Sequence, residues 1–142
     1  MKVIAVSTSE KTGEKKINRD QVKLIENFGI QGDAHAKNWH RQVSLLGIED
    51  IELMRARGAV VNPGDFAENI TTSGGLLWTF PVGTRFRAGE STILELTQIG
   101  KECHSGCAIM KLSGSCIMPT RGIFCKVIKG GFLRPGDELN PL

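Results

Sequence analysis

Short runs in which apolar and polar residues alternate recur along the chain and predict a protein built mainly from β-strands. Residues 2–9, 84–88 and 92–99 read as strands of this kind, and a tight turn of sequence AGES joins the last two. Further strands are expected over 21–30, 43–46, 69–72, 122–131 and in the closing stretch RPGDELNPL. The stretch 32–42 has no period and is rich in polar groups, so we expect a loop there.

One segment, 48–57, has the spacing of an amphipathic helix. Ile48, Ile51 and either Met54 or Leu53 fall on one face, and Gly58 follows as a stop signal. Many short strands, glycine-rich turns and a single helix are typical of a closed or nearly closed β-barrel. We therefore predict a mainly β fold with minor α content.

Length and charge limit the classes of protein to consider. The 142 residues fit one domain, expected to span 1–142. No stretch approaches the ~20 apolar residues that span a bilayer, and the N-terminal apolar run is too short for a secretory signal, so we expect a cytoplasmic protein without a membrane partner. The net charge of +3 is too weak to indicate nucleic-acid binding. Residues 101–134, however, carry six basic groups against one acid, which favours a small anion such as phosphate.

All four cysteines lie within this basic stretch. In a reducing compartment, clustered cysteines are more often metal-binding or reactive than disulfide-bonded. Nearby positive charge favours the thiolate, and Cys107 lies between two glycine–serine turns that leave room for a ligand, so Cys107 is the strongest candidate. Cys103 and Cys116 are open between a functional and a structural role, and together with His104 and Cys107 they could instead hold zinc. Cys125 lies in an apolar strand pattern and is expected to be buried.

Two polar loops could contact a ligand. The first gathers Asp33, His35 and Arg41; it is either a solvated loop in which Asp33 caps a turn, or an anion cradle in which the Arg41 fork and a His35 donor hold phosphate. In the second, Asn69 and Thr71 could hydrogen-bond a heterocycle or satisfy loop backbone. The sequence has no P-loop, GxGxxG, GxSxG or HExxH motif, so the common nucleotide-binding, serine-hydrolase and zinc-protease classes have no support.

Five separated segments together resemble the MOSC family, named for the C-terminal domain of molybdenum cofactor sulfurase, and match its short, stand-alone bacterial branch. They are GDAHAKNWHRQVSLLGIEDI, PGDFAENITTSGG, PVGTRFRAGES, IGKECHSGCAIMKLSGSCIMPTRGIFCKVIKGG and RPGDEL. The resemblance implies a closed, Greek-key-like β-barrel similar to the small barrel domain of pyruvate kinase. It also implies work on sulfur and the molybdenum–pyranopterin cofactor.

The resemblance suggests roles for several residues. The family cysteine, a molybdenum ligand in oxidoreductase members, corresponds best to Cys107, and Cys103 and Cys116 with His104 look like an extra thiol set. On this basis we expect Cys107 to accept sulfane sulfur or ligate molybdenum, and Cys103 or Cys116 to resolve the persulfide. The pterin phosphate is expected to meet His35, Arg41 and Arg121, with Asn69 at the heterocycle and His104 beside the thiols.

The expected function is that of a molybdenum cofactor-handling protein that carries or transfers sulfur. A pyridoxal-phosphate-dependent cysteine desulfurase would supply sulfur from a separate chain, and a molybdoenzyme or a cofactor biosynthesis protein would accept it; no pyridoxal phosphate site is expected here. Whether the chain catalyses a reaction alone is left open. The alternatives are a molybdenum-dependent reductase of N-hydroxylated compounds with a separate electron donor, and a cofactor storage module with a zinc site.

Overall fold

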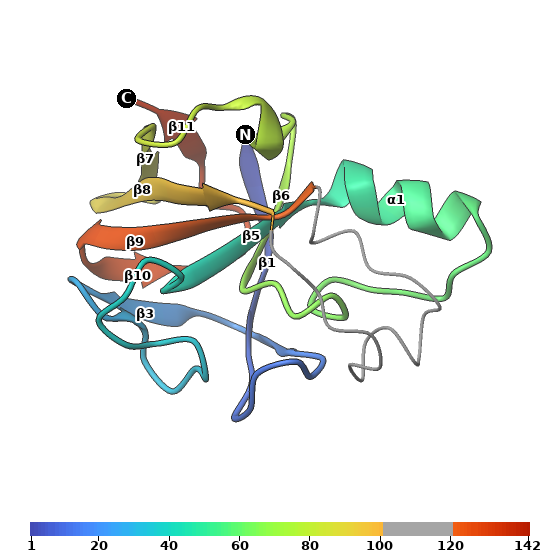
Figure 1. Cartoon of the computed structure of the whole chain (residues 1–142), viewed down its shortest axis with the longest axis horizontal. Coiled ribbons are helices and arrows are strands. Elements are labelled where there is room, and N and C mark those ends of the chain that lie inside the picture. The colour runs from blue at the N-terminus through green and yellow to red at the C-terminus, as the bar shows by residue number, and fades with distance from the viewer. Residues whose placement is uncertain (101–120) are drawn as a thin grey trace.

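The computed structural model describes residues 1–100 and 121–142, and strands dominate these residues (Figure 1). Cys103, His104, Cys107 and Cys116 lie outside the described residues. The elements are β1 (Lys2–Thr8), β2 (Ile17–Arg19), β3 (Val22–Ile25), β4 (Gly29–Ile30), β5 (Val43–Gly47), α1 (Ile48–Ala56), β6 (Ile70–Ser73), the 3₁₀-helix η1 (Leu77–Thr79), β7 (Arg85–Ala88), β8 (Thr92–Ile99), β9 (Ile123–Lys129), β10 (Gly131–Leu133) and β11 (Leu139–Pro141). The predicted mainly β fold with one α-helix is confirmed for this part of the chain.

The strands of the described residues form two sheets. The larger has the order β11-β7-β8-β9-β5-β6-β1-β2, and the smaller has the order β10-β3-β4. Neighbouring strands run antiparallel except β5 and β6, which are parallel and are joined through α1. Parallel neighbours need a crossover connection, and α1 provides it, projecting to one side of the sheets in Figure 1.

The two sides of the larger sheet approach each other through the start of the chain. Val3 N donates to Asp137 O at 2.8 Å, Gly136 N donates to Val3 O at 2.8 Å, and Leu139 N donates to Met1 O at 2.9 Å. These bonds join β1 to the segment that leads into β11. The described ladders nevertheless form open, mixed sheets, so the closed Greek-key-like barrel stays a prediction.

The core follows the two-residue period of the strands. In β7, Phe86 and Ala88 are buried while Arg85 and Arg87, which alternate with them, are exposed. Apolar residues of this kind from both sheets form the main cluster, which includes Leu94 and Val127. A second cluster packs α1 against β5 and β9; Met54 is buried in it while Leu53 stays 40% exposed, which decides between the two residues left open for the helix face.

Some elements differ from the expected ones. The single strand expected over 21–30 is divided into β3 and β4, because Asn27 adopts a positive φ of 53° and turns the chain. The short strands β2 and β10 and the 3₁₀-helix η1 were not predicted. All three residues of β2 are exposed, and β10 begins at a glycine, so neither strand carries the alternation that would reveal it.

A tight backbone crossing at Gly64 gives the first testable prediction. Gly64 has a φ of +94°, its carbonyl accepts the Lys16 N–H at 2.8 Å, and a Cβ there would lie 2.6 Å from Lys16 O. We expect Gly64→Ala to lower the free energy of unfolding by ~3 kcal/mol or more. The new Cβ is strained by the left-handed backbone conformation, and it also overlaps with a main-chain oxygen. Gly13→Ala is the matched control: its φ is +74° but no atom lies within 4 Å, so ~1 kcal/mol is expected. Equal losses for the two variants in urea unfolding would contradict the close approach.

Candidate functional site

Asp33 is the anchor of the polar loop between β4 and β5. Its carboxylate accepts hydrogen bonds from Ser9 N at 3.0 Å, from His35 N at 3.0 Å and from Lys16 Nζ at 2.8 Å. His35 Nδ1 also lies 3.5 Å from Asp33 Oδ2. The side chains of Lys16 and Asp33 are both 0% exposed, so they form a fully buried ion pair. Asp33 therefore both orders the loop backbone and orients the His35 ring.

The charge on Asp33 follows from these contacts. Burial alone would raise the pKa of the Asp33 carboxyl. Hydrogen bonds from His35, together with the charge and the hydrogen bond of Lys16, overcome that effect and hold the pKa well below its ordinary value. The carboxylate is therefore ionised throughout the physiological range, and it holds Lys16 as its counter-ion.

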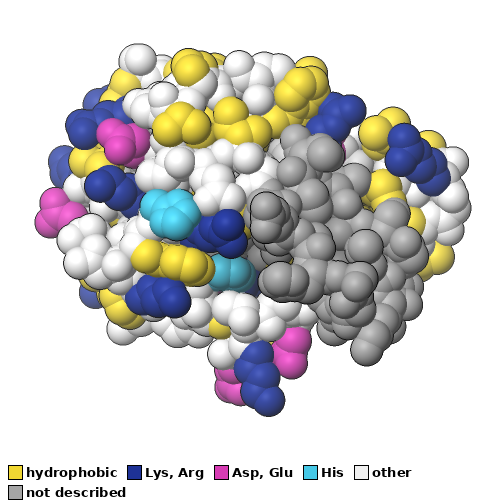
Figure 2. Space-filling model, in the orientation of Figure 1, with side chains coloured by type: hydrophobic (Ala, Val, Ile, Leu, Met, Phe, Trp, Pro, Cys, Tyr) yellow, Lys and Arg dark blue, Asp and Glu magenta, His cyan; other side chains and the backbone are white. Residues whose placement is uncertain are grey.

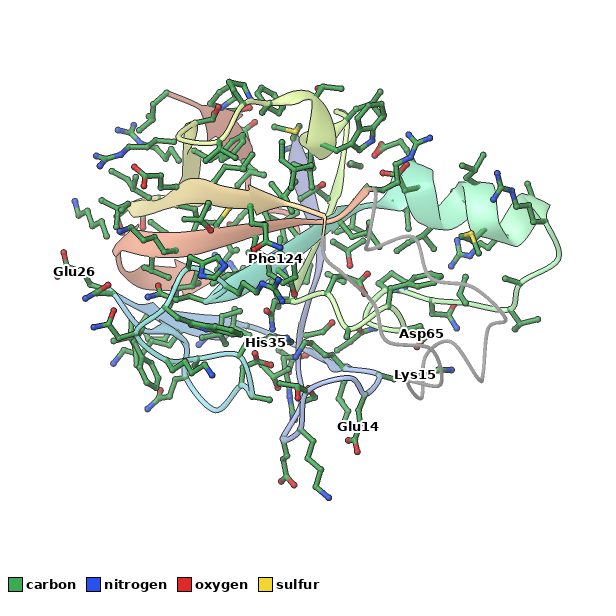
Figure 3. The ribbon with its side chains drawn as sticks, in the orientation of Figure 1. Glu14, Lys15, Glu26, His35, Asp65 and Phe124 are labelled. Atoms are coloured by element: carbon green, nitrogen blue, oxygen red, sulfur yellow. The ribbon has the colours of Figure 1, made fainter. Side chains whose placement is uncertain are left out.

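Phe124 lies where His35 and Arg41 meet the sheet. The ring centroids of His35 and Phe124 are 6.5 Å apart at an interplanar angle of 52°, and Arg41 Cζ lies 5.3 Å from the centroid of Phe124. Figure 3 shows Phe124 and His35 close to each other in the middle of the molecule. A guanidinium over an aromatic face is attracted by the ring quadrupole. The structure thus brings together two of the residues expected to hold a phosphate.

Gln98 of β8 holds this arrangement from the other side. Its Oε1 accepts Arg41 Nε–H at 3.0 Å and faces His40 Nε2 at 2.9 Å, while its Nε2 donates to Gly100 O at 2.8 Å. Figure 2 shows His side chains with Lys or Arg side chains beside them on this face of the molecule. One amide side chain therefore links the polar loop to Gly100, which directly follows β8.

The cysteine-bearing stretch joins the described chain next to this site. Residues 101–120, which contain three cysteines, lie in the chain between Gly100 and Arg121. Gly100 N donates to Gly122 O at 2.7 Å, and Ile99 of β8 pairs with Ile123 of β9. The two points at which this stretch connects to the sheets are therefore neighbours, and Gln98 is bonded to one of them.

Arg121 and Asn69 have different surroundings from His35 and Arg41. Arg121 Nη1 lies 3.6 Å from Asp50 Oδ1, and its Cζ lies 4.5 Å from the ring centroid of Trp78, so it packs between α1 and η1. Asn69 is fully buried: its Oδ1 accepts Ser44 N–H at 3.0 Å and its Nδ2 donates to Ser7 O at 3.0 Å. Asn69 thus connects β1, β5 and the start of β6, and its contact with a heterocycle stays a prediction.

Several residues of the site gave no signal in the sequence. Lys16 ends a polar turn rich in exposed lysines, and nothing in the spacing distinguishes the one that is buried. Gln98 and Phe124 occupy ordinary strand positions, so their partnership with Arg41 depends on which strands become neighbours. Cys125 is fully buried, as expected, and burial raises the pKa of its thiol well above the ordinary value.

Glu68 is a buried acid in the second polar loop. Its Oε2 accepts Thr71 Oγ1–H at 2.9 Å and its Oε1 accepts Phe66 N–H at 3.2 Å. Burial raises the pKa of Glu68 to about 7, against hydrogen bonds from backbone N–H groups and Thr71 that favour the ionised form. Ala67, beside it, has a positive φ of 65°, so this loop holds both an unusual backbone conformation and a buried carboxyl.

The chain is similar to a known family of protein domains. The MOSC domain family model matches residues 31–140, and the chain belongs to this family. A comparison with curated proteins gives no match. Within residues 1–100 and 121–142, no helix is long and apolar enough to cross a membrane, and no three His, Cys, Asp or Glu side chains are grouped to hold a metal. The residues that could instead hold zinc, Cys103, His104, Cys107 and Cys116, lie in the stretch outside those residues.

Solved structures share the fold. The crystal structure of the YUAD protein from Bacillus subtilis aligns with a TM-score of 0.82 at 20% identity, covering 97% of this chain and 93% of that one. YiiM from Geobacillus stearothermophilus aligns with a TM-score of 0.74 at 17% identity, covering 99% and 74%. YiiM from Escherichia coli aligns with a TM-score of 0.69 at 19% identity, covering 100% and 70%. At such low sequence identities, the structural similarity shows only that these proteins share a fold.

The ion pair at Asp33 gives a stability prediction. Asp33→Asn leaves the Lys16 ammonium buried without its counter-ion, so the free energy of unfolding at pH 7 should fall by ~3–5 kcal/mol. Because folding lowers the pKa of Asp33 from its ordinary 3.8, its contribution is present above that value and is lost as the pH falls. Urea unfolding between pH 3 and 7 should therefore show a gap between wild type and variant that is constant near neutral pH and begins to narrow as the pH falls below 3.8 towards 3. Glu138→Gln, in the exposed pair with Lys2, is the control and should change little.

Glu68 predicts the opposite pH dependence. Folding raises its pKa from 4.5 to about 7, so its contribution is fully present below pH 4.5 and is lost as the pH rises through 7. Comparing wild type with Glu68→Gln by urea unfolding, we expect the free-energy difference to shift by ~3 kcal/mol between pH 4.5 and 8, with wild type relatively more stable in acid. Glu14→Gln, at an exposed position, is the control variant. A constant difference for Glu68→Gln would show that folding does not raise the pKa of this carboxyl.

Proposed function

We propose that this protein binds the molybdenum–pyranopterin cofactor as a substrate and transfers sulfur through a reactive cysteine during the maturation of molybdoenzymes. Membership of the MOSC domain family, which is associated with this cofactor, supports the class of ligand. The sulfur chemistry is supported by the cysteine-rich stretch and by its attachment beside a cationic site.

The observation that carries the proposal is the placement of Arg41. Gln98 fixes its Nε, and Phe124 supports its guanidinium from one side. Within the described chain, its two terminal nitrogens have no hydrogen bond to protein. A planar fork held in this way suits two oxygens of a phosphate better than a mobile ammonium would. His35, oriented by Asp33, adds a second donor near the same ring.

These residues fit the charged end of the cofactor. The phosphate of the pterin is an anion, which matches the cationic Arg41 and a His35 donor beside the same Phe124 ring. When bound, the cofactor supplies a molybdenum centre with sulfur ligands, for which a soft thiolate is an appropriate partner. Arg41, His35 and Gln98 would then orient the phosphate end close to where the cysteine-bearing stretch joins β8.

Sulfur transfer follows thiol–persulfide exchange. The Cys107 thiolate attacks the outer sulfur of a cysteine persulfide on the donor, the donor S–S bond breaks, and the donor cysteine leaves as a thiolate. Cys103 or Cys116 then attacks the inner sulfur, which releases hydrosulfide to the acceptor and leaves an intramolecular disulfide. Two thiols of a cellular dithiol or thiol reductant then reduce that disulfide to two free cysteines and are themselves oxidised to a disulfide. Positive charge from the flanking basic residues would favour the attacking thiolate.

The donor and acceptor are separate proteins in this proposal. A pyridoxal-phosphate-dependent cysteine desulfurase generates the persulfide, and a molybdoenzyme or a cofactor biosynthesis protein receives the sulfur. The chain would act in the cytoplasm, where desulfurases and reduced thiols coexist.

Two variants separate sulfur loading from cofactor binding. With a cysteine desulfurase and free cysteine, Cys107→Ser should gain no persulfide sulfur by mass spectrometry, because the attacking thiolate is absent. Arg41→Lys should still load sulfur but bind the cofactor ~10-fold or more weakly, since lysine cannot form the two-pronged contact. Cofactor binding is read by equilibrium dialysis under nitrogen, and Cys125→Ala serves as the control because that thiol is fully buried.

The outcomes distinguish the proposal from its alternatives. Full persulfide loading in Cys107→Ser would overturn the assignment of the sulfur carrier. Reduction of a hydroxylaminopurine by cofactor-loaded protein with an artificial electron donor would instead establish the reductase. One tightly held zinc per chain, with neither sulfur loading nor cofactor binding, would establish the zinc-containing module.

A further inference from the structure

Two cavities that share lining residues lie on the smaller sheet, and one of them reaches Gln31 and Gly32 at the start of the polar loop. They have volumes of about 400 and 350 Å³, and both are lined by Gln21 and Phe132. Neither is lined by His35, Arg41 or Phe124. In Figure 1, β3 and β10 lie at the lower left, on the opposite side of the sheets from α1. Gln21 and Phe132 line both cavities, which are together called the groove below, and each has a volume in the range that small-molecule ligands occupy.

Phe132 is the apolar surface of this groove. It is 59% exposed, whereas Leu133, the next residue along β10, is fully buried. Phe132 pairs in register with Lys23 of β3, so the two side chains stand next to each other on the outer face of the sheet. Within the described part of the chain, the Phe132 ring has no aromatic neighbour and no cation over it. A planar ligand can therefore stack on it.

Cationic side chains line one end of the groove. The cavity beyond Phe132 includes Arg19 and Lys23 and no acidic residue. Arg19 Nε donates to Thr8 Oγ1 at 3.0 Å, which fixes the guanidinium on the neighbouring strand. In residues 1–100 and 121–142, neither Arg19 nor Lys23 forms an ion pair with a carboxylate. Two cations without counter-ions, one of them held in place, suit a phosphate group.

The other end of the groove offers acceptors. Glu90 and Asp137 line it together with Arg134. Asp137 Oδ2 accepts the Arg134 N–H at 3.0 Å, so this carboxylate is held in a tight turn. The groove therefore has two distinct ends: carboxylates lie at one end and cations at the other, with an exposed aromatic ring between them. Ribose hydroxyls and base amino groups are donors, so they complement the acidic end.

We propose that this groove binds a nucleoside monophosphate. The base stacks on Phe132, the phosphate lies against Arg19 and Lys23, and Glu90 or Asp137 accepts hydrogen bonds from the sugar or the base. The site is separate from the proposed sulfur-transfer site and does not depend on it.

Isothermal titration calorimetry with AMP, adenosine and inorganic phosphate tests the site on the full-length protein. We expect AMP to bind at least ~10-fold more tightly than either fragment, because both ends of the groove contribute. Its affinity should fall as salt is raised, since the phosphate meets cations. Equal affinities for AMP and inorganic phosphate would overturn the proposal and leave a simple anion patch. No binding of AMP at millimolar concentration would also overturn it.

Matched variants locate the binding. Phe132→Ala should weaken AMP binding by ~5- to 100-fold through loss of stacking, while Phe28→Ala, at another partly exposed phenylalanine, should leave it unchanged. Lys23→Gln should weaken binding and reduce its salt dependence, while Lys129→Gln, at an exposed position on β9, should do neither. Because these positions are exposed, we expect the variants to fold, and circular dichroism checks their secondary structure. Equal effects of Lys23→Gln and Lys129→Gln would show non-specific attraction and overturn the site.

Discussion

The buried ion pair between Lys16 and Asp33 is the constraint on which the polar loop depends. Both side chains are removed from water, so each charge requires the other together with additional hydrogen bonds. Asp33 also receives the backbone N–H groups of Ser9 and His35, and Lys16 also donates to Ser9 Oγ. The pair therefore ties the turn after β1 to the loop before β5, and any movement of the loop would expose or separate two charges.

The sheet supplies the other half of the site. Arg41 and Gln98 are 57 residues apart in the chain, and they meet because β8 and β5 both lie beside β9. Phe124, on β9 between them, presents its ring to Arg41 and to His35. The order of three strands thus determines the position of one guanidinium. The same order places the two attachment points of the cysteine-bearing stretch side by side.

Much of the fold could be predicted because burial imposes a two-residue period on strands with one face in the core. The segments at 43–46 and 92–99 and the helix at 48–57 were found within a residue or so of their observed bounds. Strands without such a pattern were missed: β2 is exposed at every position, and β10 begins at a glycine. The turn at Asn27, which divides 21–30, depends on a backbone conformation that alternation does not reveal.

The residue types in the sequence indicated that His35 and Arg41 could together bind a phosphate. The apolar pattern around Cys125 predicted that it lies in the core, and five sequence segments carried the motifs of the MOSC family. Local properties of the chain suffice for these inferences, because composition, spacing and the order of motifs can all be read directly from the sequence. Tertiary structure alone decided which of many lysines is buried against Asp33, and that Gln98 holds Arg41 above Phe124. It also decided that the Asn69 amide bonds to β1 and β5 and that Arg121 packs against Trp78. Each of these contacts joins segments distant in the chain, and their pairing follows from strand order and burial, which a local pattern does not contain.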